Sequence, residues 1–138
     1  MITTACNLKL TIKNKKQYMK SSNFRELKVW QKAMELTVEV YSLVKILPPV
    51  ETYGLCDQMR RSVVSIPSNI AEGQGRESMK EFIRFLSVAR GSLRELSTQL
   101  DICVRVNYLE ESQTANACVL IEEIDKMLNA LANSLIPF

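Results

Sequence analysis

The chain has 138 residues, with 46% hydrophobic and 24% charged side chains, which is the composition of one ordinary globular domain. It contains no histidine, and this excludes histidine-based acid–base catalysis, Ser-His and Cys-His nucleophile pairs, and zinc sites with histidine ligands. Only 4 glycines and 4 prolines occur, too few for an all-β fold built from many tight turns.

The net charge of +3 is unevenly distributed along the chain. Residues 1–23 contain five lysines and no acidic residue, whereas the remainder contains 13 basic and 15 acidic residues. We therefore divide the chain into a basic, flexible leader, 1–23, and a helical domain, 24–138. The leader is interpreted as a solvated tail, with a nucleic-acid-binding arm as the less common alternative. Residues 1–18 are expected to be dispensable for folding and assembly.

The sequence indicates a cytoplasmic protein without a membrane span. Lysines interrupt the leader too often for the apolar region of a secretory signal, and no apolar run approaches the roughly 18 residues of a membrane span. The four cysteines are widely spaced and form no CxxC motif. We expect them to be reduced, with Cys56, Cys103 and Cys118 as small core residues, and we expect no metal or cofactor.

The first half of the domain contains two predicted helices. The first extends from Phe24 to Leu47 and ends before Pro48, because a proline pair cannot continue a helix. The second extends from near Thr52 to about Ala71, and the glycines that follow end it. Pro67 lies inside this second helix, so we expect a kink or break there.

The second half of the domain contains two further predicted helices. The third begins after Ser78, a favourable N-cap with Glu81 three residues later, and extends to about Val106. The fourth extends from Glu111 to Ser134, with Ser112 as the candidate N-cap. Because short loops join long helices, the predicted fold class is all-α, an antiparallel up-down four-helix bundle.

The first predicted helix carries two apolar stripes on opposite sides. Trp30, Met34 and Val38 belong to one stripe. Together the stripes exceed the apolar arc that a helix on the outside of a monomeric bundle needs, so the helix must bury two faces. We expect one face to lie against a neighbouring subunit in a ring-forming homo-oligomer. The predicted interface is the other stripe, namely Val29, Ala33, Leu36, Val40 and Leu43.

The third predicted helix carries basic residues on the side opposite its apolar face. This is either an ordinary solvated face or a surface that binds phosphates, since arginine makes bidentate contacts that lysine cannot. The candidate nucleic-acid-binding residues are Lys80, Arg84, Arg90, Arg94 and Arg105. Gly91, inside the same helix, is interpreted as a packing notch.

A second group of polar residues surrounds Pro67 on the second predicted helix. One interpretation is a polar plug that satisfies backbone groups freed by the proline; the alternative is a pocket or anion site. Glu72 and Arg76 have the i,i+4 spacing of an ion pair. The full candidate set is Arg60, Arg61, Ser65, Asn69, Glu72 and Arg76.

One long segment carries a resemblance to a known family. Residues 54–95 read GLCDQMRRSVVSIPSNIAEGQGRESMKEFIRFLSVARGSLRE, and residues 24–44 read FRELKVWQKAMELTVEVYSLV. Over about residues 24–134 the chain resembles the four-helix-bundle proteins encoded in the intervening sequences of bacterial 23S rRNA genes. The resemblance implies a homopentameric bundle without enzyme activity. The family also includes accessory variability proteins of retroelements, which bind nucleic acid and a reverse transcriptase through a basic surface.

From these observations we expect a non-catalytic oligomeric bundle that binds RNA or DNA weakly, without sequence specificity, through its arginine-rich faces. The alternative is a scaffold for a protein partner, for example a reverse transcriptase, without nucleic-acid binding. The domain without its leader is slightly acidic, in contrast with the basic surface of the retroelement accessory proteins. An enzyme is not expected, because the chain lacks the Glu-x-x-His type of inward acid motif.

Overall fold

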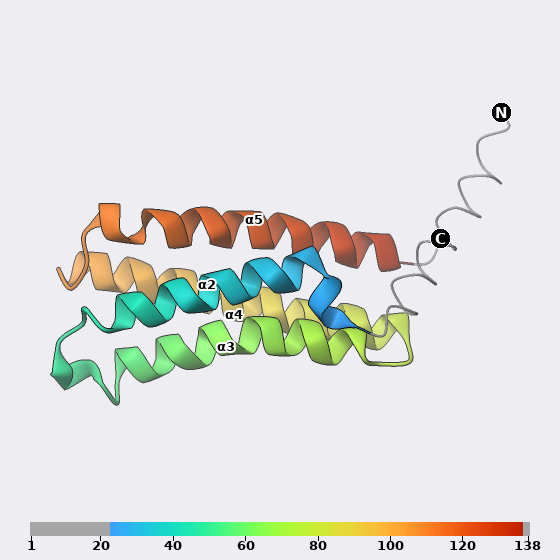
Figure 1. Cartoon of the computed structure of the whole chain (residues 1–138), viewed down its shortest axis with the longest axis horizontal. Helices are drawn as coiled ribbons and strands as arrows, with labels where there is room; N and C mark the ends of the chain where they lie inside the picture. Colours follow the sequence, from blue (N-terminus) through green and yellow to red (C-terminus); the bar gives the residue numbers. More distant parts are fainter. Residues whose placement is uncertain (1–22, 137–138) are drawn as a thin grey trace, which may run out of the picture.

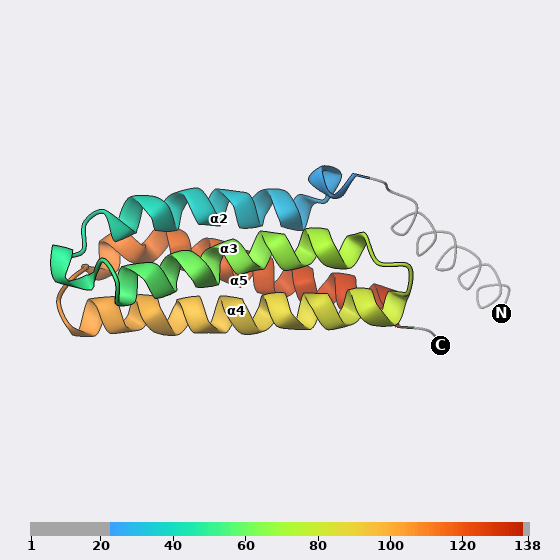
Figure 2. The same ribbon diagram turned by 90° about the horizontal axis from the view of Figure 1, so that it is seen from below.

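The structure, a computed structural model, describes residues 23–136, and the predictions for residues 1–22 lie outside these described residues. Over this range the chain forms four α-helices and no strand, which confirms an all-α four-helix fold. Consecutive helices run in opposite directions (Figure 1), and they remain side by side in the perpendicular view (Figure 2). The elements are η1 (Phe24–Glu26), α2 (Lys28–Val44), η2 (Pro49–Glu51), α3 (Leu55–Gln74), α4 (Met79–Arg105) and α5 (Glu111–Leu135).

The hydrophobic core lies along the axis of the bundle. Helices α2 and α4 each pack against both α3 and α5. Every helix contributes side chains that are almost entirely buried, for example Leu36, Ile66, Leu96 and Ile124. The helical spacing of apolar residues in the sequence therefore marks one continuous core.

The first predicted helix is interrupted near its start. Leu27 has an extended backbone, which separates the 3-10 turn η1 from α2 and leaves the N-terminus of α2 without a side-chain cap. The ring of Phe24 packs edge-on against that of Trp30, with 5.4 Å between centroids. The predicted span of Phe24 to Leu47 was thus too long at both ends, because α2 begins at Lys28 and ends at Val44.

Helix α3 continues through Pro67 without a break. A proline leaves the carbonyl four residues earlier without its helical donor, and that carbonyl belongs to Val63. The hydroxyl of Thr37, on α2, lies 3.5 Å from the Val63 oxygen and 2.8 Å from that of Ala33. A neighbouring helix therefore places a polar group beside the gap, and the expected break does not occur.

The caps of α4 and α5 show one confirmed prediction and one wrong prediction. Ser78 is the N-cap of α4, and its hydroxyl accepts a hydrogen bond from the backbone N–H of Glu81 at 3.1 Å. Ser112 is not the N-cap of α5. That position belongs to Glu110, whose side chain forms a reciprocal capping box with Gln113. Because glutamate is rarely an N-cap, the residue-type preference favoured the serine.

Two glycines inside helices have opposite environments. A Cβ atom on Gly73 would lie 2.7 Å from the Phe85 Cβ and 2.9 Å from the Phe82 Cδ2, so this glycine permits the close approach of α3 to α4. A Cβ atom on Gly91 would meet nothing within 4 Å. The packing notch predicted at Gly91 is therefore wrong, and the notch lies at Gly73.

Candidate functional site

The polar residues around Pro67 form a cluster between α3 and α4. The Ser65 hydroxyl lies 2.8 Å from that of Ser92 on α4. The Asn69 amide donates to the Ser65 hydroxyl at 2.9 Å and to the Ser65 carbonyl at 2.7 Å. The side chains of Ser65, Asn69 and Ser92 are therefore hydrogen-bonded within the protein, which is the arrangement expected of a polar plug at a proline.

A second internal polar contact was not predicted from the sequence. The hydroxyl of Ser62 lies 2.7 Å from the Gln99 Oε1, and the Gln99 amide donates to the Glu95 carboxylate at 3.3 Å. Ser62 and Gln99 are both buried. In the sequence, each of α3 and α4 has a polar residue at a position that otherwise faces the core. In the structure these two side chains form a hydrogen bond with each other, as buried polar groups generally do.

The arginines assigned to the same group do not form an anion site. Arg61 pairs with Asp57 at 3.2 Å, and Arg60 donates to the Thr52 carbonyl at 3.2 Å, both near the start of α3. Arg76 pairs with Glu72 at 2.7 Å beyond the end of α3, which confirms the predicted i,i+4 pair. Because the helix rises about 1.5 Å per residue, Arg76 lies more than roughly 20 Å from Arg60. The predicted set is therefore divided between the two ends of the bundle.

The basic face of α4 is confirmed as exposed at four of five positions. Lys80, Arg84, Arg94 and Arg105 are exposed and take part in no ion pair among residues 23–136. Arg90 differs, because its guanidinium donates to Asp125 at 3.0 Å and to Asn129 at 3.3 Å on α5. Arg90 is turned toward α5, so it is not a free member of the face.

The two stripes of α2 were assigned to the wrong partners. All five predicted interface residues are buried within the core of their own chain, with Ala33, Leu36 and Val40 at 0% exposure. The opposite stripe remains in contact with solvent, since Val38 is 67% exposed, Tyr41 40% and Met34 39%. The wide apolar arc was correctly read as two faces, but sequence periodicity does not say which of them faces the bundle. The predicted interface residues were Val29, Ala33, Leu36, Val40 and Leu43.

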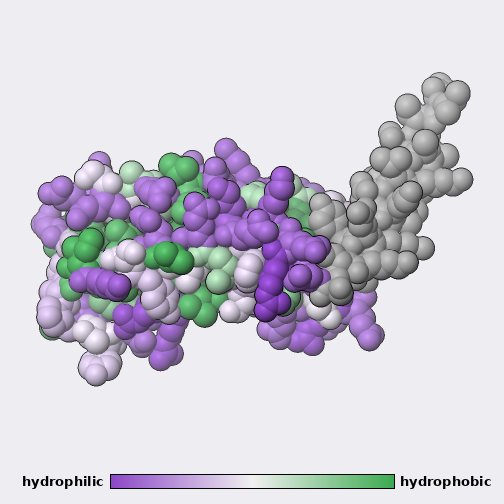
Figure 3. All heavy atoms as spheres, viewed as in Figure 1, coloured by the Kyte–Doolittle hydropathy of each residue, from purple (hydrophilic) through white to green (hydrophobic). Residues whose placement is uncertain are grey.

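The exposed stripe of α2 continues into a shallow groove beside α3. The groove has a volume of about 320 Å³. Its walls come from Trp30 and Met34 on one side and from Val64 and Pro67 on the other, and Phe24 is part of its lining. Val64 is itself 41% exposed. Figure 3 shows hydrophobic side chains among the polar ones on the face that α2 and α3 present.

Two cysteine thiols are unsuited to nucleophilic chemistry. Burial raises the pKa of Cys103 to about 11, and burial also raises the pKa of Cys56. Cys118, in contrast with the prediction, is exposed on α5. Burial at two positions follows from their inward spacing, whereas Cys118 lies next to Ala117, the residue that faces the core.

Titratable groups also join the loops at one end of the bundle. The Tyr108 hydroxyl donates to Glu51 at 3.0 Å, and this hydrogen bond raises the pKa of Tyr108. The other oxygen of Glu51 accepts from the Leu55 N–H at 3.0 Å.

Within residues 23–136 no group of three or more Cys, Asp or Glu side chains could hold a metal ion. None of the described helices is long and apolar enough to cross a membrane.

Comparison with known proteins identifies a matching family and similar solved structures. The family model of the 23S rRNA-intervening sequence proteins matches residues 25–130. Among solved structures, the chain is similar to a protein of unknown function from the S23 ribosomal protein family of Bacteroides thetaiotaomicron, with 28% identity and a TM-score of 0.70. This likeness covers 75% of the present chain and 97% of that one. None of the curated proteins compared with the chain matches it.

Proposed function

The chain belongs to the family of 23S rRNA-intervening sequence proteins, and from this premise we propose that it is a non-catalytic interaction protein whose copies associate through the outer face of α2. The observation that carries the proposal is the exposed apolar stripe of α2. Met34, Val38 and Tyr41 lie on the side of the helix that does not face the core, and Trp30, at the edge of this stripe, is partly buried. Contiguous apolar surface of this kind marks interaction sites on otherwise polar proteins.

A second copy is the occupant that the surface favours. The groove beside α3 is apolar, and Lys32, Glu35 and Glu39 on the neighbouring side of α2 supply charges of both signs. A rim with both signs suits contact with a copy of the same chain. The homopentamer implied by the family resemblance needs a heterologous contact, in which this face meets a different surface of the next copy.

Association through α2 is tested by a charge on the exposed stripe. We expect the unmodified protein to be an oligomer at micromolar concentration and Val38→Asp to reduce its mass to that of one chain, while helical circular dichroism is retained. Val119→Asp is the matched control, because Val119 is 55% exposed on α5. The measurement is multi-angle light scattering. A monomeric parent protein, or a Val38→Asp variant of unchanged mass, would contradict the proposal.

Weak, sequence-independent binding of RNA or DNA is the second candidate function. Its support is the set of exposed cations on α4 that have no carboxylate partner among the described residues, with Arg84 and Arg94 between Lys80 and Arg105. The guanidinium carbons of Arg84 and Arg76 lie 6.0 and 4.9 Å from the ring centroid of Phe85, so two cations flank one ring. Repetition of this face in an oligomer would add weak contacts together.

Fluorescence anisotropy at two salt concentrations tests this second candidate. The double variant Arg84→Glu, Arg94→Glu should weaken binding about equally for every sequence. It should also flatten the salt dependence by roughly 0.7–0.9 per lost phosphate contact on a log–log plot. Arg61→Glu is the control, since Arg61 is exposed but lies on α3 and pairs with Asp57. Equal binding by the double variant and the parent protein would contradict nucleic-acid binding through this face. Association between copies would then be the remaining proposed function.

A further inference from the structure

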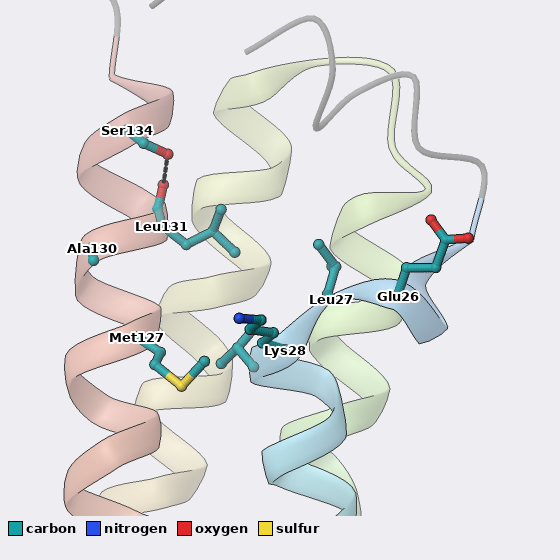
Figure 4. Close-up of a pocket in the computed structure, with 8 residues that line it drawn as sticks. Glu26, Leu27, Lys28, Met127, Ala130, Leu131 and Ser134 are labelled. Atoms are coloured by element: carbon teal, nitrogen blue, oxygen red, sulfur yellow. Dashed lines mark hydrogen bonds between the residues drawn. The ribbon is translucent and has the colours of Figure 1, made fainter. Parts of the chain in front are cut away.

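A cavity lies at the end of the bundle, between the beginning of α2 and the last turns of α5. Its volume is about 440 Å³, within the usual range of small-molecule pockets. Leu27 and Val29 line it from the α2 side, and Met127 and Leu131 line it from the α5 side (Figure 4). This cavity is separate from the groove between α2 and α3, which has no lining residue in common with it.

The cavity results from the different lengths of the two helices that border it. Helix α5 continues to Leu135, whereas α2 begins only at Lys28, after the extended residue Leu27. The preceding turn, η1, packs against α2 and α3 and places Phe24 on Trp30, away from α5. Among residues 23–136, no helix therefore covers the last turns of α5 on this side, and Met127 contributes a flexible, polarisable wall.

The charged groups at the cavity are asymmetric. In Figure 4 the nitrogen of Lys28 lies on the side of its helix that faces α5, whereas the carboxylate of Glu26 points away from α5. Lys28 takes part in no ion pair among residues 23–136, although Lys32, one turn later, pairs with Glu35 and Glu123. The uncapped N-terminus of α2 adds partial positive charge at the same place. Because Lys28 is exposed, the apolar pocket has a solvated positive charge at its rim.

We propose that this cavity binds a small amphiphilic carboxylate. Its hydrocarbon part would lie against Leu27, Val29, Met127 and Leu131, and its carboxylate would pair with the Lys28 ammonium at the start of α2. A neutral ligand of the same length would fill the walls equally well but would form no ion pair with the exposed ammonium of Lys28. The site uses the inner edge of α2 and the end of α5, so it does not depend on association through Val38 and its neighbours.

The test uses octanoate and 1-octanol as probes of the full chain. Binding is followed by shifts of the Met127 and Leu131 methyl resonances in two-dimensional NMR. We expect octanoate to shift both methyls and to bind about two- to fivefold more tightly than 1-octanol, because an ion pair with an exposed lysine contributes up to about 1 kcal/mol. Lys28→Met should remove this preference, and Ala130→Phe, which places a ring in the lining, should abolish both titrations.

Lys32→Met is the matched control, because Lys32 is a lysine of the same helix that does not line the cavity. It should leave the preference for octanoate unchanged. Three results would overturn the proposal: no methyl shifts at millimolar octanoate, an equal loss of preference in the Lys28 and Lys32 variants, or nuclear Overhauser contacts between residues 1–22 and Leu131 in the free protein. The last result would identify the chain's own N-terminal segment as the occupant.

Discussion

The two faces of α2 are both apolar, and they have opposite environments. The inner face, represented by Ala33, Leu36 and Val40, is completely buried. The outer face, represented by Met34 and Val38, is exposed over about the same length of helix. The hydrophobic effect therefore accounts for the inner face within one chain, and the outer face still has apolar surface that association could bury.

Hydrophobic periodicity alone does not distinguish the faces, because both repeat at helical spacing. What distinguishes them is the position of α3 and α5, which pack against α2 on the inner side. A polar residue marks the boundary: Thr37 is directed to α3, where its hydroxyl lies beside the carbonyl freed by Pro67. The position of Thr37, whose hydroxyl lies beside the Val63 carbonyl on α3, therefore indicates which face of α2 points inward. The number of apolar residues on each face does not.

The largest predicted effect comes from a charge on the inner face. Val40→Asp should prevent cooperative folding, because an unpaired carboxylate would be buried at a position with no exposed area, at a cost of more than about 4 kcal/mol. Val38→Asp, two residues away and 67% exposed, should keep a cooperative melting transition. Thermal unfolding followed by circular dichroism measures both. A folded Val40→Asp variant would mean that the faces are assigned wrongly.

The same contrast explains which parts of the fold could be predicted from the sequence. Helix number, order and the Ser78 cap depend on local signals, and they were correct. The orientation of α2, the bond of Arg90 to Asp125, and the Glu110 cap depend on neighbours or on an uncommon cap type, and they were missed. For the candidate site, exposure of the α4 cations was predictable, but the division of the Pro67 group between two ends depends on α3 continuing through Pro67, where a kink or break was expected.

The two helical glycines, Gly73 and Gly91, give a second comparison, with an intermediate expected change in the free energy of unfolding. Gly73→Ala should destabilise the protein by about 1–3 kcal/mol, because the new methyl group would overlap with Phe85 and Phe82. Gly91→Ala should stabilise it by up to about 1 kcal/mol, since alanine fits an open helical site and restricts the unfolded chain. Urea denaturation of both variants gives the free energies of unfolding. Equal effects of the two substitutions would contradict the assignment of the notch to Gly73.

The smallest predicted effect concerns two arginines four residues apart on α4. Arg90 and Asp125 are about one-third exposed, with side-chain exposures of 32% and 35%, so water screens their ion pair. Arg90→Ala should therefore lower the free energy of unfolding by no more than about 1 kcal/mol. Arg94→Ala should not change it measurably, because Arg94 is exposed and has no ion pair among the described residues.

A double-mutant cycle with Asp125→Ala isolates the Arg90 contribution, and urea denaturation at low and high salt supplies the measurement. The coupling between positions 90 and 125 should decrease as salt is added. Coupling between positions 94 and 125 should be absent at both salt concentrations, although Arg94 and Asp125 line the same shallow pocket between α4 and α5. Coupling of equal size for both arginines would show that Arg90 does not differ from the rest of the basic face. In that case Arg90 would return to the set of cations available for phosphate contacts.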